Sequence, residues 1–195
     1  MKRWAGLVLG VVLVATGCAG PSPAPQPWPR ASVPQGVPPP PGMGRYGQRS
    51  LPYAGARQVD YLLVDKTRRM LIAYAGGQPV RVYHGIQLGG TPQGHKQFEG
   101  DRRTPEGLYT ISTRNPASRF YLSLRISYPN AADRAFAARY GRSPGGDIFL
   151  HGQPNGYPAG RVPGDWTDGC IALTNEEIAE LWAIVPDGTP IQIRS

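Results

Sequence analysis

The chain has 195 residues, a length that fits one domain of ordinary size better than two. It contains 22 prolines and 26 glycines, close to the share at which part of a chain is usually unfolded. The net charge of +8 is concentrated before residue 58, where six basic and no acidic residues lie, so a basic nucleic-acid-binding domain is excluded. Only two cysteines are present, Cys18 and Cys170, which excludes a disulfide-dense scaffold and a multi-cysteine metal site.

The N-terminus has the pattern of an export signal. Lys2 and Arg3 precede an apolar run over residues 5–16, which is too short for a bilayer core that needs about 20 residues. A charged start, a short apolar run and small residues predict a signal peptide over residues 1–17. The ending Ala-Thr-Gly-Cys resembles a bacterial lipoprotein signal, which would make Cys18 a lipidated first residue; an ordinary secretory signal is the alternative. Either way we expect the protein in the cell envelope or periplasm.

Residues 18–57 are rich in proline, with ten prolines between Pro21 and Pro41. Proline fixes φ and lacks an N–H group, so this segment favours extended polyproline II conformation and buries few apolar side chains. We interpret it as a disordered tether between a membrane and a polymer layer. A proline-rich ligand for an SH3-like partner is the alternative, which fits an exported protein less well.

The remaining residues 58–195 predict one mainly β domain. Residues 69–85 are rich in β-branched and aromatic residues and are interrupted at Gly76 and Gly77, which indicates a hairpin. The strands expected from this pattern cover residues 59–65, 69–85, 107–112, 120–126, 147–150 and 191–193. Helices are expected at 131–140 and 175–185, the second with a capping box from Thr174 to Glu177 and a stop at Pro186.

The second cysteine lies in the segment DWTDGCIALTN, just before the expected second helix. If Cys18 is lipidated or removed, Cys170 has no partner. An unpaired thiol in an exported protein suggests that its reactivity is needed. The alternative is a small buried hydrophobic residue, which describes most free cysteines.

His151 follows the expected strand 147–150 and precedes Gly152, so its side chain would stand at the mouth of a rigid platform. A thiol near pKa 8.5 is mostly protonated at neutral pH and needs a base, and histidine is the usual one. Main-chain N–H groups of Gly169 and Cys170 are the candidate donors to an oxyanion. His84 and His95 are compatible with surface positions, and the absence of an HExxH motif or paired histidines leaves no expected metal ligands.

Three ordered motifs resemble one family. The pair HG at 151–152 and the segment TDGCIALTN, with 15 residues between His151 and Thr167, resemble the signature of the L,D-transpeptidase (YkuD-type) catalytic domain. The segments FEGDRRTPEGLY (98–109) and VDKTRRMLIAYAGGQPVRVYHGIQLG (64–89) resemble its strand entry and its opening hairpin. The resemblance runs from about residue 59 to the C-terminus. It implies a β-sandwich with one or two short helices, no cofactor, Cys170 as the acylated nucleophile and His151 as its general base.

The resemblance also implies a reaction. Family members attack the carbonyl of the third residue of a peptidoglycan stem tetrapeptide, expel the terminal D-Ala, and pass the thioester to an amine of another stem or of a wall-linked protein. Hydrolysis by an L,D-carboxypeptidase or endopeptidase is the rival outcome. A non-catalytic wall-binding lipoprotein is a third hypothesis. The expected partners are peptidoglycan stem peptides and, through Cys18, a membrane.

Two positions depart from the family pattern. Asp168 stands where many members have a second histidine, and Ala172 stands where Arg or Asn is common. An acid near Cys170 disfavours the thiolate by charge, although it would also suit a substrate amine. The missing Arg removes a carboxylate anchor, for which Arg161 or Arg125 is a candidate replacement.

Six further residues near the motif are expected to shape its loops or to touch substrate: Gly152, Asp165, Trp166, Thr167, Asp168 and Asn175. Trp166 is also compatible with a core position, and Thr167 with a simple turn hydroxyl.

Overall fold

The computed structural model describes residues 58–195. The signal peptide expected over residues 1–17, the tether over 18–57 and the lipidation site Cys18 lie outside the described residues. Neither helix of the described part combines the length and the hydropathy needed to cross a membrane.

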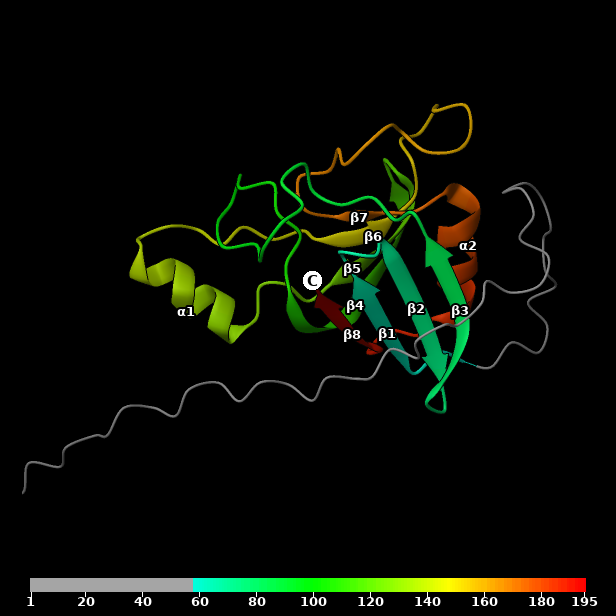
Figure 1. The fold of residues 1–195 in the computed structure, drawn as a ribbon, viewed down its shortest axis with the longest axis horizontal. Helices are drawn as coiled ribbons and strands as arrows, with labels where there is room; N and C mark the ends of the chain where they lie inside the picture. Colours follow the sequence, from blue (N-terminus) through cyan, green and yellow to red (C-terminus); the bar gives the residue numbers. More distant parts are fainter. Residues whose placement is uncertain (1–57) are drawn as a thin grey trace, which may run out of the picture. The chain divides into compact units, whose positions relative to one another are not determined.

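Eight strands form one hydrogen-bonded sheet in the order β3-β2-β1-β8-β4-β5-β6-β7. The strands are labelled in Figure 1. The strands are β1 (Tyr61–Asp65), β2 (Met70–Ala75), β3 (Gln78–His84), β4 (Gly107–Ser118), β5 (Tyr121–Ile126), β6 (Phe149–His151), β7 (Ile171–Ala172) and β8 (Pro190–Arg194). Two pairings are parallel, β1 with β8 and β6 with β7, and the others are antiparallel. The expected mainly β fold with two short helices is therefore confirmed.

The opening hairpin has the form that the sequence predicts. Strands β2 and β3 are antiparallel and are joined at Gly76 and Gly77, whose φ values are +60° and +73°. Positive φ is accessible to glycine without a steric penalty, so these two residues allow the tight reversal.

The long strand β4 connects the two halves of the sheet. Its residues Gly107–Thr110 pair with β8, and residues from Ile111 onward pair with β5 through two register shifts. The sequence predicted only residues 107–112 here, because the polar second half of β4 has no alternating apolar pattern. Bulged strands bend, which lets one strand serve both halves.

Strand β7 has only two residues and was not expected from the sequence. It pairs in parallel with β6, and on its other side Ala172 forms an isolated bridge with Gln87. A strand this short has no periodicity to detect, and it exists because both neighbours satisfy its main-chain groups.

Both helices begin at capping boxes. Helix α1 (Ala131–Arg139) is capped by Asn130 and Asp133, and it lies to one side of the sheet in Figure 1. Helix α2 (Asn175–Ile184) is capped by Thr174 and Glu177 as the sequence predicts. These reciprocal bonds satisfy main-chain N–H groups that a helix leaves without partners at its first turn.

A single core joins the two halves of the sheet, as in a sandwich. It contains Leu62, Val64 and Leu71 from one half, Ile111, Leu124, Leu150 and Ile171 from the other, and Ile178 and Leu181 from α2. Helix α2 thus packs its apolar stripe against the strands that carry the candidate site.

The substitution Leu181→Ala tests this packing. Leu181 is fully buried, so its truncation should lower the free energy of unfolding by about 2–5 kcal/mol. Urea unfolding measures the loss. The matched control is Glu176→Ala on the exposed face of α2, which should cost less than about 1 kcal/mol. Equal losses in the two variants would contradict the placement of α2.

Candidate active site

The parallel pairing of β6 with β7 brings the segments of the two predicted reactive residues together. His151 lies opposite Ala172, and Leu150 lies opposite Ile171. Cys170 immediately precedes β7, and the main chain of Phe149, the first residue of β6, donates a hydrogen bond to its thiol. His151 is the last residue of the same strand, two positions further along the chain.

The imidazole of His151 is almost completely buried, with 2% of the residue exposed. Its ring stacks on Phe120 with 4.6 Å between ring centroids and meets Trp166 edge-on at 5.6 Å. Nδ1 lies 2.7 Å from the main-chain oxygen of Gly152. Because a carbonyl oxygen only accepts hydrogen bonds, Nδ1 carries the proton and Nε2 keeps its lone pair.

Burial also determines the protonation state of His151. Loss of solvation lowers the pKa of its imidazole to about 4, and the bond to Gly152 opposes that change only in part. The imidazole is therefore neutral at neutral pH and is able to accept a proton.

The thiol of Cys170 is protonated in the resting site. Burial raises its pKa to about 11, with further increases from the carboxylates of Asp168 and Asp147. A hydrogen bond from the Phe149 main chain and the charge of Lys96 act in the opposite direction. The Sγ atom lies 3.5 Å from the main-chain oxygen of Asp147. The resting pair is thus a neutral thiol and a neutral imidazole.

Thr167 closes the turn that carries Cys170. Its hydroxyl donates to the main-chain oxygen of Cys170 at 2.7 Å and accepts from the N–H of Gly169 at 3.1 Å. The Gly169 N–H is therefore already occupied within the turn. Within residues 58–195, the Cys170 N–H donates to no protein group, so it is the better placed of the two predicted oxyanion donors.

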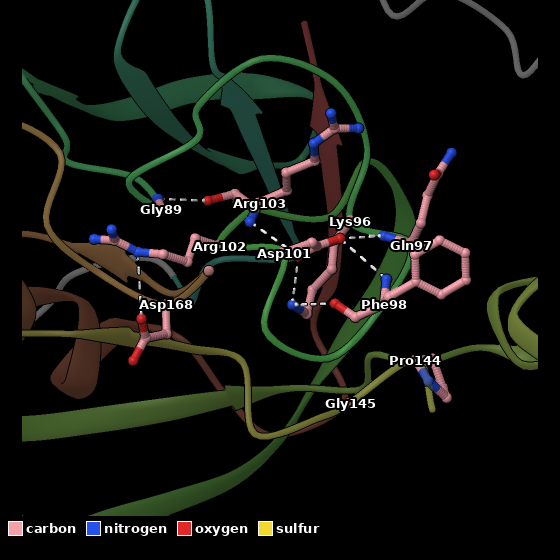
Figure 2. Close-up of polar contacts among 12 residues, drawn as sticks. Gly89, Lys96, Gln97, Phe98, Asp101, Arg102, Arg103, Pro144, Gly145 and Asp168 are labelled. Atoms are coloured by element: carbon pink, nitrogen blue, oxygen red, sulfur yellow. Dashed lines mark hydrogen bonds and ion pairs between the residues drawn. The ribbon is translucent and has the colours of Figure 1, made fainter. Parts of the chain in front are cut away.

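The loop 96–103 packs directly on this turn. A Cβ atom at Gly169 would lie 2.6 Å from the carbonyl oxygen of Arg103, and the φ of Gly169 is +133°. Figure 2 shows Asp101 at the centre of this loop. Its carboxylate accepts from Lys96 Nζ and from the main-chain N–H groups of Gln97, Phe98 and Arg103 at 2.7–3.0 Å. Sequence reasoning did not find this role of Asp101, and the signal that could have found it is its place inside the motif FEGDRRTPEGLY.

The segment Thr104–Gly107 acts as the strand entry that the sequence predicts. Gly107 begins β4, and the buried hydroxyl of Thr104 accepts from the N–H of Gly89 at 3.0 Å. These contacts join the loop to the residues that follow β3.

Asp165 and Trp166 hold the other side of the site. Asp165 receives two hydrogen bonds from the guanidinium of Arg69, at 2.9 and 2.6 Å, and a third from the N–H of Leu88. The ring of Trp166 packs beside Phe120 and His151, while its buried Nε1 has no hydrogen-bond partner among residues 58–195. Both residues thus lie where loop-shaping residues were expected.

Gly152 and Asn175 tie the end of β6 to α2. A Cβ atom at Gly152 would lie 2.5 Å from Asn175 Oδ1, which instead accepts from the N–H of Gln153 at 2.9 Å. Gly152 also donates its N–H to Phe120 and Leu122. Only glycine leaves room for this approach.

Two buried glutamines complete the site and were missed by sequence reasoning. Gln153 Nε2 donates to Gln87 Oε1 at 3.1 Å and to Leu173, and its Oε1 accepts from the N–H of Val162. Gln87 in turn donates to Gly164 at 2.6 Å. This pair fixes the loop 152–165 over the sheet. No local pattern marks these residues, because both partners are remote in sequence.

The two residues that depart from the family pattern, Asp168 and Ala172, lie in different environments. Asp168 points into solvent with 94% of its side chain exposed, 3.6 Å from Arg102 Nε (Figure 2). Ala172 is buried opposite His151. Of the two candidate replacements, Arg161 is fully engaged by His84, Gly85 and Glu177, whereas Arg125 binds the exposed Asp147 at 2.9 Å.

The two other histidines are not at the site's centre. His95 is bound on both ring nitrogens, by the N–H of Glu106 at 2.9 Å and by Asp133 at 3.1 Å, so it has a structural role and is not a free surface residue. His84 ends β3 and is partly exposed. Within the described part of the chain, no group of three His, Cys, Asp or Glu residues is placed to hold a metal ion.

The structure thus defines a mainly β domain in which a buried, neutral imidazole and a free cysteine lie on adjoining strand segments. The profile of the YkuD family, described as the L,D-transpeptidase catalytic domain, matches residues 59–193. The chain belongs to this family.

Two relatives illustrate the similarity. The "Putative L,D-transpeptidase YafK" of Escherichia coli K12 is 35% identical over 95 residues, which cover 47% of this chain and 32% of that protein. The crystal structure of Pgp2 of Campylobacter jejuni, described as a helical cell shape determining protein, has a TM-score of 0.57 and 26% identity, covering 71% of this chain and 48% of that one. The chain thus spans about a third to a half of the length of these relatives.

Stability should depend on pH through His151. Its folded pKa lies below the unfolded value near 6.5, so below pH 6.5 the unfolded chain binds a proton that the folded chain does not. The free energy of unfolding should therefore decrease as the pH is lowered, and this group should contribute about 3 kcal/mol of the decrease between pH 7 and pH 4. Urea unfolding at pH 7 and pH 4 gives the difference in unfolding free energy between the two pH values. This difference should be smaller by about 3 kcal/mol in His151→Gln and unchanged in His84→Gln. An unchanged difference in His151→Gln would refute the buried neutral imidazole.

The substitution Gly169→Ala tests the contact between the turn and the loop 96–103. The new Cβ atom would clash with the Arg103 carbonyl, so the variant should lose about 1–3 kcal/mol more than Gly164→Ala. Gly164 also has positive φ but nothing within 4 Å of an added Cβ. Thermal unfolding compares the two. Equal losses would show that backbone strain alone matters at Gly169.

Proposed function

We propose that the protein is a peptidoglycan L,D-transpeptidase of the cell envelope. In this proposal Cys170 attacks the carbonyl of the third residue of a stem tetrapeptide, D-Ala leaves, and an amine acceptor resolves the thioester. The single observation that carries the proposal is the parallel pairing of β6 with β7, which brings the chain segments of His151 and Cys170 together. Membership of the L,D-transpeptidase family supports the choice of substrate.

His151 performs the proton transfers in this reaction. Its Nδ1–H is bound to Gly152, so Nε2 takes the thiol proton while the bond between Sγ and the carbonyl carbon forms. The oxyanion that results accepts a hydrogen bond from the Cys170 N–H. The imidazolium then gives its proton to the departing amine of D-Ala, the carbon–nitrogen bond breaks, and the thioester remains on Cys170.

The electrostatics delay activation until substrate is bound. A thiol of pKa about 11 beside an imidazole of pKa about 4 does not form an ion pair in the empty site. Charge separation becomes favourable only when the developing oxyanion and its donors are present. The free enzyme is thereby protected from oxidation and alkylation, which act on the thiolate.

Location in the envelope follows from the same proposal. The export signal predicted over residues 1–17 would deliver the domain to the wall, and Cys18 would anchor it to a membrane. The description of Pgp2 as a cell shape determining protein agrees with a role in wall structure. Transfer to an amine gives a cross-link or a wall-bound protein, whereas transfer to water makes the protein an L,D-carboxypeptidase or endopeptidase.

The test incubates the purified protein with disaccharide tetrapeptides and identifies the products by mass. We expect release of D-Ala and formation of cross-linked dimers. Cys170→Ala should abolish turnover, and His151→Gln should lower kcat about 10²–10⁴-fold, while circular dichroism shows both variants folded. Loss of D-Ala with uptake of water would assign the hydrolase instead. Turnover by Cys170→Ala, or none by the native protein, would refute the proposal.

A further inference from the structure

Asp147 connects an arginine to the thiol. Its main-chain oxygen lies 3.5 Å from Cys170 Sγ, and its side-chain Oδ1 accepts from Arg125 Nη2 at 2.9 Å. A single residue, Asp147, therefore contacts both the guanidinium of Arg125 and the proposed nucleophile. Asp147 has a φ of +54°, an uncommon conformation for a residue with a Cβ.

The sheet register places Arg125 beside the residue that contacts the thiol. Arg125 lies opposite Phe149 on β6, and the main chain of Phe149 donates a hydrogen bond to the thiol of Cys170. One strand spacing, about 4.7–4.9 Å, separates the main chains of Arg125 and Phe149. Arg125 is thus near enough for its long side chain to contact a molecule bound at Sγ.

The ion pair between Arg125 and Asp147 is weak enough for another carboxylate to replace Asp147. The side chains are 46% and 79% exposed, and an ion pair in solvent contributes only about 0–1 kcal/mol. A carboxylate delivered by a bound substrate would replace Asp147 at little cost. Of the other guanidinium groups around the site, Arg69 is held by Asp165 in bidentate geometry, and Arg161 is held by Glu177 and two carbonyls. Arg102 forms a longer, exposed pair with Asp168 at 3.6 Å, and its main chain lies in the loop 96–103 and not on β5.

Building on the proposed function, we infer that Arg125 binds the terminal carboxylate of the donor stem peptide. In the empty site the carboxylate of Asp147 pairs with Arg125, and the substrate carboxylate replaces it. In a tetrapeptide attacked at its third residue, only the amide nitrogen and Cα of D-Ala separate the reacting carbonyl from that carboxylate. Arginine binds a carboxylate through two parallel N–H bonds. A fifth residue would move the carboxylate about 3.5 Å further away, so the same contact selects donors of four residues.

The experiment compares two donors on the purified protein, a tetrapeptide ending in D-alanine and the same peptide ending in D-alaninamide. The native protein should show a KM about 10–100-fold lower for the acid than for the amide. Arg125→Gln should raise the KM of the acid by this factor, leave its kcat within about twofold, and leave the amide unchanged. Arg68→Gln is the matched control, since Arg68 is 49% exposed and also pairs with one aspartate.

A second variant makes the result independent of the folding of Arg125→Gln. Asp147→Asn removes the competing charge and keeps a residue type that tolerates positive φ, so the KM for the acid should fall about 2–5-fold. Equal KM values for acid and amide in the native protein, or equal effects of Arg125→Gln on both donors, would overturn the inference while the transpeptidase proposal stands. Failure of the native protein to release D-Ala or D-alaninamide would instead refute the proposed function.

Discussion

The parallel pairing of β6 with β7 is the constraint on which the site depends. It aligns His151 with Ala172 and holds Ile171, the residue after Cys170, beside Leu150. A shift of one residue would turn either side chain to the opposite face, because side chains alternate along a strand. The register is secured from both sides, since β6 also pairs with β5, and Ala172 exchanges main-chain hydrogen bonds with Gln87.

Burial, more than charge, determines the chemistry of the resting site. The aromatic rings of Phe120 and Trp166 help to exclude water from His151, and burial of the thiol of Cys170 keeps that group protonated. A site of this kind is inert toward solvent and responds to a substrate that supplies the missing charges. In our proposals the substrate contributes a developing oxyanion and a carboxylate, which is why Arg125 has a role beside Cys170.

Polar side chains hold the loops around this apolar centre. Asp101 organises the loop 96–103, Asp165 binds Arg69, and Gln87 with Gln153 fixes the loop after β6. Each of these side chains satisfies main-chain groups that a loop would otherwise bury without partners. The positions of the reactive groups therefore depend on residues that take no part in the chemistry.

The sequence by itself determined the elements with local signals and the family. Alternation predicted the hairpin of β2 and β3, and a capping box predicted α2 at Thr174. The motif from His151 to Cys170 indicated the family and proposed the reactive residues. Only the tertiary structure decided the two-residue strand β7, the occupation of the Gly169 N–H, the partners of Asp101, and the different partners of Arg125 and Arg161. Periodicity and caps act within a few residues, whereas these features come from contacts between segments far apart in the chain, whose pairing no local pattern encodes.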